Sequence, residues 1–269
     1  MQYLYGSGEA AALSRQAYAA LVGYVRERVA ERRATRLIAP GKTPPTLARP
    51  LSAVLSPAAT LAAPEWGACD AKPAAVVFDV DETVLLNTGY EYAEAATGQP
   101  YEAARWERWE QTGERAVRAV PGAAEALAAL RGMGVTVVFN TNRSATNAPF
   151  TERALEGAGL GPARHGDTLF LKGDAPGSSG KDGRRALIAA RWCVVAMVGD
   201  QLGDFSDLFN SGINPAERRA AAQGPAFAER WGRGWFLLPN PVYGSGLAGG
   251  FDDVFPTDSR WTDPGAAKD

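Results

Sequence analysis

The chain contains little histidine and little cysteine. Its 269 residues include one histidine, His165, and two cysteines, Cys69 and Cys193. A zinc site of the usual His-rich type, or a cysteine protease, needs further histidine as ligand or base. The cysteines lie far apart and form no CxxC pair, so they indicate neither a metal motif nor a redox motif. The sequence leaves open whether they form one disulfide or remain two thiols.

The sequence also lacks an excess of charge and a long apolar run. It has 28 Lys and Arg against 30 Asp and Glu, a formal net charge of -2. This balance argues against a nucleic acid polymer or an anionic membrane as the main partner. No stretch approaches the about 20 apolar residues of a membrane helix, and the start MQYLYGSGEA lacks the regions of a signal peptide. We therefore expect a soluble chain without a transmembrane segment; whether an export signal was removed stays open.

The regions at the two ends differ in composition from the middle. We expect residues 1–73 to form an N-terminal helical or cap region, because residues 9–33 carry apolar side chains at helical spacing. Residues 37–73 are rich in alanine and proline, which predicts irregular or short helical segments. Residues 244–269 turn polar and glycine-rich, and we expect a loose tail there.

The middle of the chain repeats one pattern, a buried strand that ends in polar residues. The apolar runs AAVVFDVD at 74–81, VTVVFNTNR at 135–143 and CVVAMVGD at 193–200 show it. A helix is predicted before the second run, from Pro121 near its start to Gly134 at its end. Strand, helix and strand in this order predict an α/β fold with a doubly wound parallel sheet.

An insertion follows the first predicted strand. Residues from about 87 to 120 are rich in aromatic side chains, and their place after a strand end predicts a cap over the site. We therefore expect one core from 74 to 243 with this cap inserted.

The motif DVDET carries the strongest chemical signal. Asp79 and Asp81 stand where the first strand breaks into a loop, so both carboxylates can turn toward one point. A hard cation such as Mg²⁺ takes oxygen ligands, commonly carboxylates with substrate phosphate and water. An aspartate is also a known covalent nucleophile toward phosphoryl groups.

The other predicted strand ends add groups suited to phosphate chemistry. Thr141 and Asn142 can donate hydrogen bonds to phosphate oxygens, and Lys181 can offset negative charge, with Lys172 as a nearby rival. Asp200 and Asp204 in GDQLGD supply two more carboxylates. All of them are expected at the carboxyl edge of one parallel sheet, where α/β proteins bind ligands.

In this order the motifs DVDET, TNR, a lysine and GDxxxDF resemble those of the haloacid dehalogenase superfamily. More narrowly, the chain resembles the class C nonspecific acid phosphatases, the lipoprotein e family of 5'-nucleotidases. The narrower likeness spans about residues 7–245 and is carried by SGEAAALSRQAY, DVDETVLLNTGY, WERW, AVPGAAEAL, TNR, GKDGRR, VGDQLGDF and PNPVYGS. The resemblance implies a Rossmann-like core with a helical cap, Mg²⁺ as cofactor and a small phosphate monoester as substrate.

The resemblance also implies a role for each matching residue. Asp79 would be the nucleophile that forms an aspartyl-phosphate, and Asp81 the general acid and base. Thr141 and Lys181 would bind the phosphoryl group. Magnesium would be held by Asp79, by Asp81 through its main-chain carbonyl, and by the two aspartates of GDQLGD, Asp200 and Asp204. Positioning and charge compensation of this kind are most of phosphoryl-transfer catalysis.

Aromatic residues offer two interpretations. Tyr90 and Tyr243 are candidates for stacking on a planar leaving group, with packing as the alternative. For the pair Trp106 and Trp109 we favour the core of the cap over stacking on a leaving group. For Arg143 we favour bracing of the catalytic loop over binding of phosphate.

The sequence therefore predicts a Mg²⁺-dependent acid phosphatase for small phosphate monoesters. The resemblance favours nucleoside 5'-monophosphates or nicotinamide mononucleotide. A phosphatase of sugar phosphates or other metabolites, and a catalytically silent surface or binding protein of the same fold, are the alternatives. The resemblance implies a periplasmic or cell-surface location, and a disulfide between Cys69 and Cys193 would fit an exported protein. Oligomeric state stays open.

Overall fold

Five parallel strands form the centre of the molecule. The structure is a computed structural model that describes residues 1–37, 51–177 and 179–265. The sheet has the order β7-β6-β3-β8-β9, with strand bounds β7 Leu169–Lys172, β6 Thr136–Ser144, β3 Ala74–Phe78, β8 Cys193–Gly199 and β9 Trp235–Leu237. The predicted parallel sheet is thus confirmed, and its first predicted strand, β3, lies in the middle between β6 and β8.

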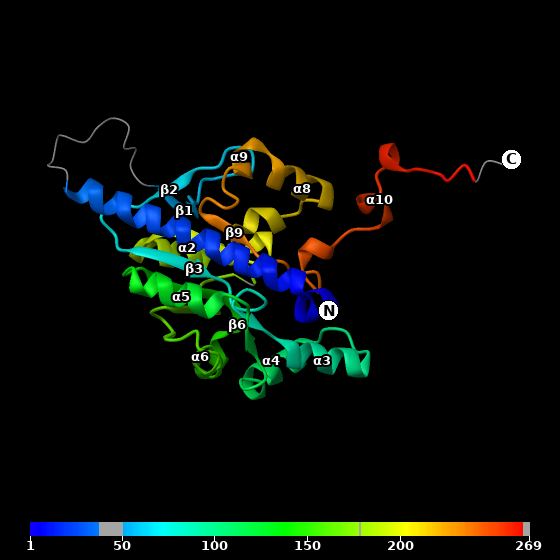
Figure 1. Cartoon of the computed structure of the whole chain (residues 1–269), viewed down its shortest axis with the longest axis horizontal. Helices are drawn as coiled ribbons and strands as arrows, with labels where there is room; N and C mark the ends of the chain where they lie inside the picture. Colours follow the sequence, from blue (N-terminus) through cyan, green and yellow to red (C-terminus); the bar gives the residue numbers. More distant parts are fainter. Residues whose placement is uncertain (38–50, 178, 266–269) are drawn as a thin grey trace.

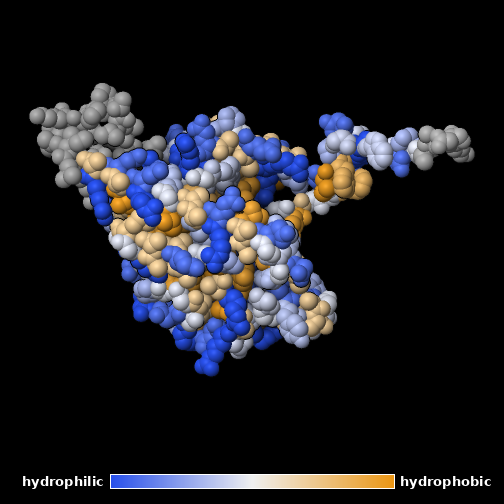
Figure 2. All heavy atoms as spheres, in the orientation of Figure 1, coloured by the Kyte–Doolittle hydropathy of each residue, from blue (hydrophilic) through white to orange (hydrophobic). Residues whose placement is uncertain are grey.

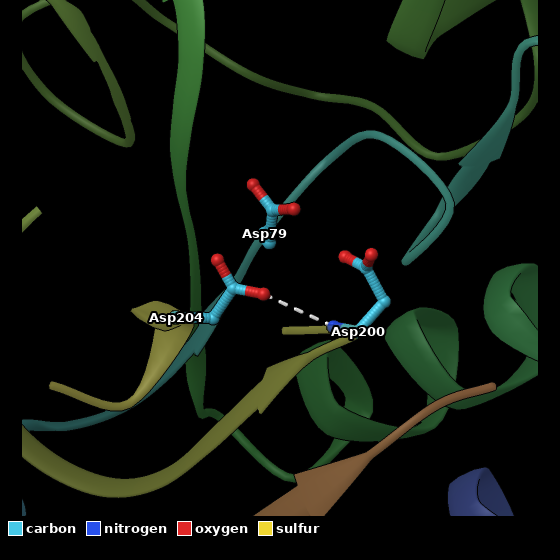
Figure 3. Close-up of side chains that lie close together, drawn as sticks. All are labelled: Asp79, Asp200 and Asp204. Carbon is cyan, nitrogen blue, oxygen red and sulfur yellow. Dashed lines mark hydrogen bonds between the residues drawn. The ribbon is translucent and has the colours of Figure 1, made fainter. Parts of the chain in front are cut away.

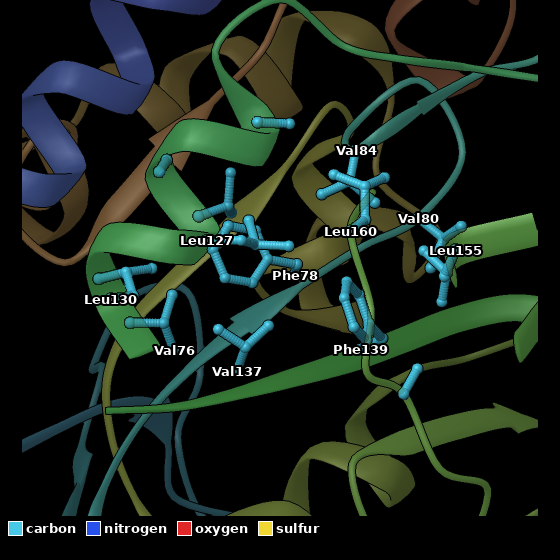
Figure 4. Packing of buried hydrophobic residues seen from close by; sticks show 14 of the residues in the cluster. Val76, Phe78, Val80, Val84, Leu127, Leu130, Val137, Phe139, Leu155 and Leu160 are labelled. Atoms are coloured by element: carbon cyan, nitrogen blue, oxygen red, sulfur yellow. The ribbon is translucent and has the colours of Figure 1, made fainter. Parts of the chain in front are cut away.

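The central strands are apolar because both of their faces are covered. Val76 and Phe78 of β3 are fully buried on one face, where Leu127 and Leu130 of α5 (Ala123–Gly132) pack against them (Figure 4). Ala75 and Val77 belong to a second apolar cluster on the opposite face. Runs of β-branched and aromatic residues without polar alternation are typical of such doubly covered strands.

Helices cover both faces, which makes the fold doubly wound (Figure 1). The first face carries α5, α6 (Ala148–Gly157) and the long helix α2 (Gly8–Leu37), whose Tyr18, Leu21 and Val25 are buried. The second face carries α7 (Asp182–Arg191) and α9 (Pro225–Ala228). A short helix α1 (Gln2–Gly6) precedes α2, and α8 (Pro215–Gln223) precedes α9.

The alanine- and proline-rich region contains a β-hairpin that the sequence did not predict. Within 37–73, residues 38–50 lie outside the described part of the chain. Strands β1 (Leu51–Leu55) and β2 (Trp66–Ala68) then pair antiparallel, so the prediction of irregular or short helical structure is wrong for these residues. Distant contacts hold the hairpin: Trp235 donates its indole N–H to the carbonyl of Ala53 at 2.8 Å.

The insertion after β3 forms two helices at one end of the sheet (Figure 1). They are α3 (Thr88–Thr97) and α4 (Ala103–Thr112). The two-residue strands β4 (Leu85–Leu86) and β5 (Arg118–Ala119) pair antiparallel where the insertion leaves and rejoins the core. The insertion is therefore anchored at both of its ends.

The C-terminal segment runs away from the body of the molecule (Figure 1). It contains the short helix α10 (Phe251–Val254) and leaves several apolar side chains exposed, visible as an orange patch in Figure 2. The exposed apolar side chains of this segment are Leu247, Phe251, Val254, Phe255 and Trp261. Over the described ranges, none of the helices combines the length and the apolar character needed to span a membrane.

The two cysteines are joined. Cys69, ahead of β3, and Cys193, the first residue of β8, form a disulfide with their Cα atoms 4.5 Å apart. Both residues are fully buried. The structure thus decides between the two states that the sequence left open.

Candidate active site

The carboxyl ends of the parallel strands bring together residues that are far apart in the sequence. Asp79 directly follows β3, Asp200 directly follows β8, and Thr141 lies in the last part of β6. Lys181 precedes the first turn of α7. Parallel strands end at the same edge of a sheet, so a strand-terminal residue of each faces one site.

Three buried carboxylates face one another at this edge (Figure 3). Oxygen atoms of Asp79, Asp200 and Asp204 all lie within 4.8 Å of one another, and the residues are 9%, 7% and 9% exposed. Asp204 is held in place by its own loop, because its Oδ2 accepts hydrogen bonds from the backbone N–H groups of Asp200 at 3.1 Å and Gln201 at 2.9 Å. The cluster joins residues that the sequence placed at two strand ends.

Lys181 supplies the positive charge in this cluster. Its Nζ donates to Oδ1 of Asp79 and, at 2.7 Å, to Oδ1 of Asp204. Burial disfavours the charged amine, but the carboxylates of Asp204 and Asp79 outweigh it and raise the pKa of Lys181. The rival Lys172 is exposed at the end of β7, so Lys181 is the lysine that meets the carboxylates.

The negative charge of the cluster exceeds what one lysine balances. Burial, and next the nearby Asp204, raise the pKa of Asp79 well above its ordinary value. The same two causes, in the same order, raise the pKa of Asp200 to about 7. The ionised state of crowded, desolvated carboxylates of this kind becomes favourable when a divalent cation binds to their oxygens. The set therefore fits a hard divalent metal ion.

The side chain of Asp81 turns away from the three carboxylates. Its Oδ1 accepts hydrogen bonds from Arg143 Nε at 2.9 Å, Arg143 Nη2 at 2.8 Å and Asn87 Nδ2 at 2.9 Å, and Thr141 Oγ1 lies 3.3 Å from its Oδ2. Within the described residues, the possible metal cluster does not include this carboxylate. A metal contact from Asp81 is thus left to its main chain, while the bracing role expected of Arg143 takes the form of a direct contact with Asp81.

The two candidate phosphate ligands of β6 differ in exposure. Thr141 is fully buried, and its Oγ1 accepts a hydrogen bond from the backbone N–H of Arg143 at 3.2 Å. Asn142 is exposed, and its Oδ1 accepts a hydrogen bond from Arg184 Nη2 at 2.5 Å. Arg184 was not among the residues that the sequence singled out.

Glu82 is the main residue of the site that the sequence analysis missed. It is 1% exposed and has a φ of 53°, a conformation that is rare for residues other than glycine. Its carboxylate accepts hydrogen bonds from the hydroxyls of Tyr5 (3.0 Å) and Tyr243 and from the backbone N–H of Asn87 (2.8 Å). Burial, and next Asp81, raise its pKa to about 7. In the sequence, the position of Glu82 inside the DVDET motif was the one indication that it belongs to the site.

The candidate aromatic residues separate into two environments. Tyr90 is 3% exposed, and its ring lies 4.9 Å from Trp106 and 6.2 Å from Trp109, centroid to centroid. Tyr90 therefore packs inside the cap, where its ring presents no open face. Tyr243 is 37% exposed, although its hydroxyl points inward to Glu82. Of these two candidate tyrosines, Tyr243 is the one with a partly exposed ring beside the site.

A parallel α/β sheet whose carboxyl edge joins three aspartates, a lysine and a threonine defines a hydrolase of the haloacid dehalogenase type. The chain belongs to the HAD superfamily, subfamily IIIB (acid phosphatase), because the model of that family matches residues 52–246. The match contains Asp79, Thr141, Lys181 and Asp200. The chain is therefore a phosphomonoesterase, as its motifs predicted.

Solved structures with the same fold include the class C acid phosphatase of Bacillus anthracis. Its crystal structure with tungstate bound has a TM-score of 0.69 and 24% sequence identity, and the match covers 91% of this chain and 84% of that one. A second structure of the same enzyme has a TM-score of 0.68 at 24% identity and covers 91% and 83%. These likenesses confirm the predicted fold class.

Proposed function

We propose that this acid phosphatase hydrolyses small phosphate monoesters with Mg²⁺ as cofactor and an aspartyl-phosphate as intermediate. One observation carries the proposal: the buried amine of Lys181 bridges Asp79 and Asp204, beside the carboxylate of Asp200. This arrangement pairs a carboxylate nucleophile with a cation that faces the same point. Both are what transfer of a phosphoryl group requires.

The metal ion would be held by the carboxylates of Asp79 and Asp200, with the main-chain carbonyl of Asp81 and with Asp204 directly or through water. When bound, Mg²⁺ supplies charge stabilisation for the phosphate oxygens. Oxygen donors alone make up the set, which favours Mg²⁺ over softer metals. The hydrogen bonds that Asp204 already accepts from backbone N–H groups and from Lys181 favour a supporting position for it.

In the first step an oxygen of Asp79 attacks phosphorus, and the bond from phosphorus to the leaving oxygen breaks. Asp81 gives that oxygen a proton, so the product leaves as an alcohol. Lys181 and Thr141 bind the equatorial phosphoryl oxygens and offset their charge. Arg143 and Asn87 hold Asp81 in one orientation for this transfer.

In the second step Asp81 takes a proton from water, and the resulting hydroxide attacks phosphorus of the aspartyl-phosphate. The bond from phosphorus to Asp79 breaks, which releases inorganic phosphate and restores the carboxylate. The two steps use Asp81 first as acid and then as base. This alternation needs a carboxyl group that is fixed close to, but separate from, the nucleophile.

Nucleoside 5'-monophosphates or nicotinamide mononucleotide are the proposed substrates. Tyr243 supports them, because its partly exposed ring beside the site suits stacking on a planar leaving group. Sugar phosphates and other metabolites are the alternative on the same residues. A catalytically silent binding protein is disfavoured, since Asp79, Asp81 and Lys181 stand together with their contacts intact.

We further propose that the protein works in the periplasm or at the cell surface. The disulfide between Cys69 and Cys193 supports this location, because such bonds persist in oxidising compartments and are rare in the cytosol.

Phosphate release from a panel of substrates tests the proposed function. The panel contains nucleoside 5'-monophosphates, sugar phosphates and an aryl phosphate, each assayed with Mg²⁺ and with a chelator. We expect Mg²⁺-dependent turnover that is fastest for the nucleotides and is lost in Asp79→Asn. Turnover restricted to sugar phosphates would favour the alternative substrate class, and absence of metal-dependent turnover would refute the proposal.

A further inference from the structure

We propose that two adjacent arginines at the start of α7 position the two halves of the active site separately. Arg184 positions the phosphate-binding end of β6, and Arg185 positions the metal-binding loop that carries Asp204. The inference rests on the proposed function and assigns both residues as positioning residues for it. Neither contacts the three carboxylates with its side chain.

Arg184 holds the end of β6 through both terminal nitrogens. Its Nη1 donates to the backbone carbonyl of Thr141 at 2.9 Å, and its Nη2 donates to Oδ1 of Asn142 at 2.5 Å. A third, longer contact of 3.3 Å joins Nη2 to the carbonyl of Gly180, just before Lys181. Because the guanidinium occupies the Asn142 carbonyl oxygen, the amide N–H groups of Asn142 are left to face a ligand.

The guanidinium of Arg184 forms no direct ion pair with any of the described residues. The side chain is 2% exposed, and in the described part of the chain no carboxylate forms a salt bridge with it. Its Nε is buried without a hydrogen-bond partner. Burying an unpaired cation is costly unless something else favours it. Burial lowers the pKa of Arg184, and the carboxylate of Asp79 opposes this effect in part. A phosphate group at the carboxyl edge of the sheet would add a second favourable charge at longer range.

Arg185, unlike Arg184, forms direct ion pairs with carboxylates. Its Nη1 donates to the carbonyls of Gly203 at 3.0 Å and Asp204 at 2.9 Å, which fixes the backbone of the loop that presents the Asp204 carboxylate. Its charge is balanced by Asp182 at 2.5 Å and Asp207 at 3.0 Å. Asp207 in turn accepts the backbone N–H of Lys181 at 2.8 Å. Arg185 thus ties the metal loop to the residue that bridges the carboxylates.

A lysine cannot replace either arginine. Each guanidinium reaches two or more acceptors at once with a planar group, whereas an ammonium is a single point charge. The substitutions Arg184→Lys and Arg185→Lys therefore keep the charge and remove the positioning. Each variant is the matched control of the other, because the two side chains are adjacent, equally buried and on the same helix turn.

Two binding measurements distinguish the roles. Calorimetry without substrate gives the Kd of Mg²⁺, and calorimetry at saturating Mg²⁺ gives the Kd of inorganic phosphate. We expect Arg184→Lys to weaken phosphate binding about tenfold and to leave the Kd of Mg²⁺ within about twofold. We expect Arg185→Lys to weaken Mg²⁺ about tenfold, which is the usual loss when a residue behind a metal ligand is changed. Circular dichroism confirms that each variant is folded.

The inference is overturned if both variants weaken both ligands equally, or if neither variant changes its own ligand. If one variant does not fold, Arg184→Gln or Arg185→Gln takes its place under the same criteria. Failure of the proposed function gives a different result, namely a wild-type protein that binds phosphate and Mg²⁺ but releases no phosphate from any monoester.

Discussion

Arg143 and Asp81 form a nearly buried ion pair, with Nη2 of Arg143 2.8 Å from Oδ1 of Asp81. Their side chains are 1% and 14% exposed. Nε of Arg143 donates a second hydrogen bond of 2.9 Å to the same oxygen, so the guanidinium binds the carboxylate through two nitrogens. The proposed acid and base of the reaction is therefore held in a single orientation before substrate binds.

Replacing Arg143 with Gln should impair both catalysis and stability. Without the guanidinium, Asp81 keeps Asn87 and Thr141 as its side-chain hydrogen-bond partners among the described residues. The value of kcat should then fall at least about tenfold while KM changes little. The free energy of unfolding should fall by about 3 kcal/mol, because one member of a buried pair loses its partner. Steady-state kinetics and denaturant unfolding measure the two effects. Unchanged kcat in a folded variant would contradict the role assigned to Arg143.

Stability without metal should decrease as pH rises toward neutrality. The pKa of Glu82 is about 7 in the folded protein against an ordinary value of 4.5, and that of Asp200 is also about 7 against 3.8. Between these values the folded chain holds protons that the unfolded chain has released, so the free energy of unfolding falls over this range. In the presence of a chelator, Tm should therefore fall from about pH 5 to pH 7.5. A rise would contradict the raised pKa values.

Two comparisons separate the contribution of the metal-binding aspartates to this pH dependence from that of Glu82. Adding Mg²⁺ at the upper end of the range should raise Tm, since the ion compensates the carboxylates of Asp79, Asp200 and Asp204. Glu82→Gln removes one titrating group, so its Tm should depend less steeply on pH in the chelator than that of wild type. Only the slope is compared, because the variant also weakens hydrogen bonds from Tyr5 and Tyr243.

Loss of the disulfide should destabilise the fold strongly. The bond joins residues 124 positions apart, and closing a loop of that length is worth about 4 to 5 kcal/mol in the chain-entropy description. Guanidinium unfolding of Cys69→Ala/Cys193→Ala against wild type measures the loss. Thiol titration of the denatured, unreduced wild type is the accompanying control and should find no free thiol. An unchanged unfolding midpoint would contradict this prediction.

The hydroxyl of Tyr243 should affect substrate preference. Tyr243→Phe keeps the ring but removes the hydrogen bond to Glu82 that holds the ring in position. KM should therefore rise several-fold for nucleotides and aryl phosphates, which corresponds to a loss of about 1 kcal/mol in binding free energy. Glycerol phosphate, which has no planar group, should be unaffected. Tyr5→Phe is the matched control, because it removes the other tyrosine hydroxyl from Glu82 and leaves Tyr243 in place. Equal effects of both variants on all substrates would contradict a stacking role.

The sequence predicted the parts of the site that depend on strand ends. Apolar β-branched runs followed by polar residues predicted β3, β6 and β8, and residues at such ends must meet in a parallel sheet. Asp79, Thr141 and Asp200 could therefore be placed together without coordinates. The order of the motifs that contain them also carried the family resemblance, which the match over residues 52–246 confirms.

Contacts between distant segments could not be predicted. Tyr5 and Tyr243 meet Glu82 across 77 and 161 positions, and no local pattern encodes such a convergence. The β1–β2 hairpin was also missed, and one of its contacts is with a residue distant in sequence, the hydrogen bond from Trp235 to Ala53. Strand formation depends on such packing partners as well as on local propensity. The open choice for Tyr90 depended likewise on how the cap packs.

Chemical trapping of the intermediate tests the central claim most directly. Wild type is quenched during turnover of an aryl phosphate with Mg²⁺ and treated with borohydride, which reduces an aspartyl-phosphate to homoserine. Mass spectrometry of the digested protein should find homoserine at position 79 and not at position 81, and the signal should be absent from Asp79→Asn. Rapid phosphate release with no modification at Asp79, or with modification at Asp81, would contradict the account.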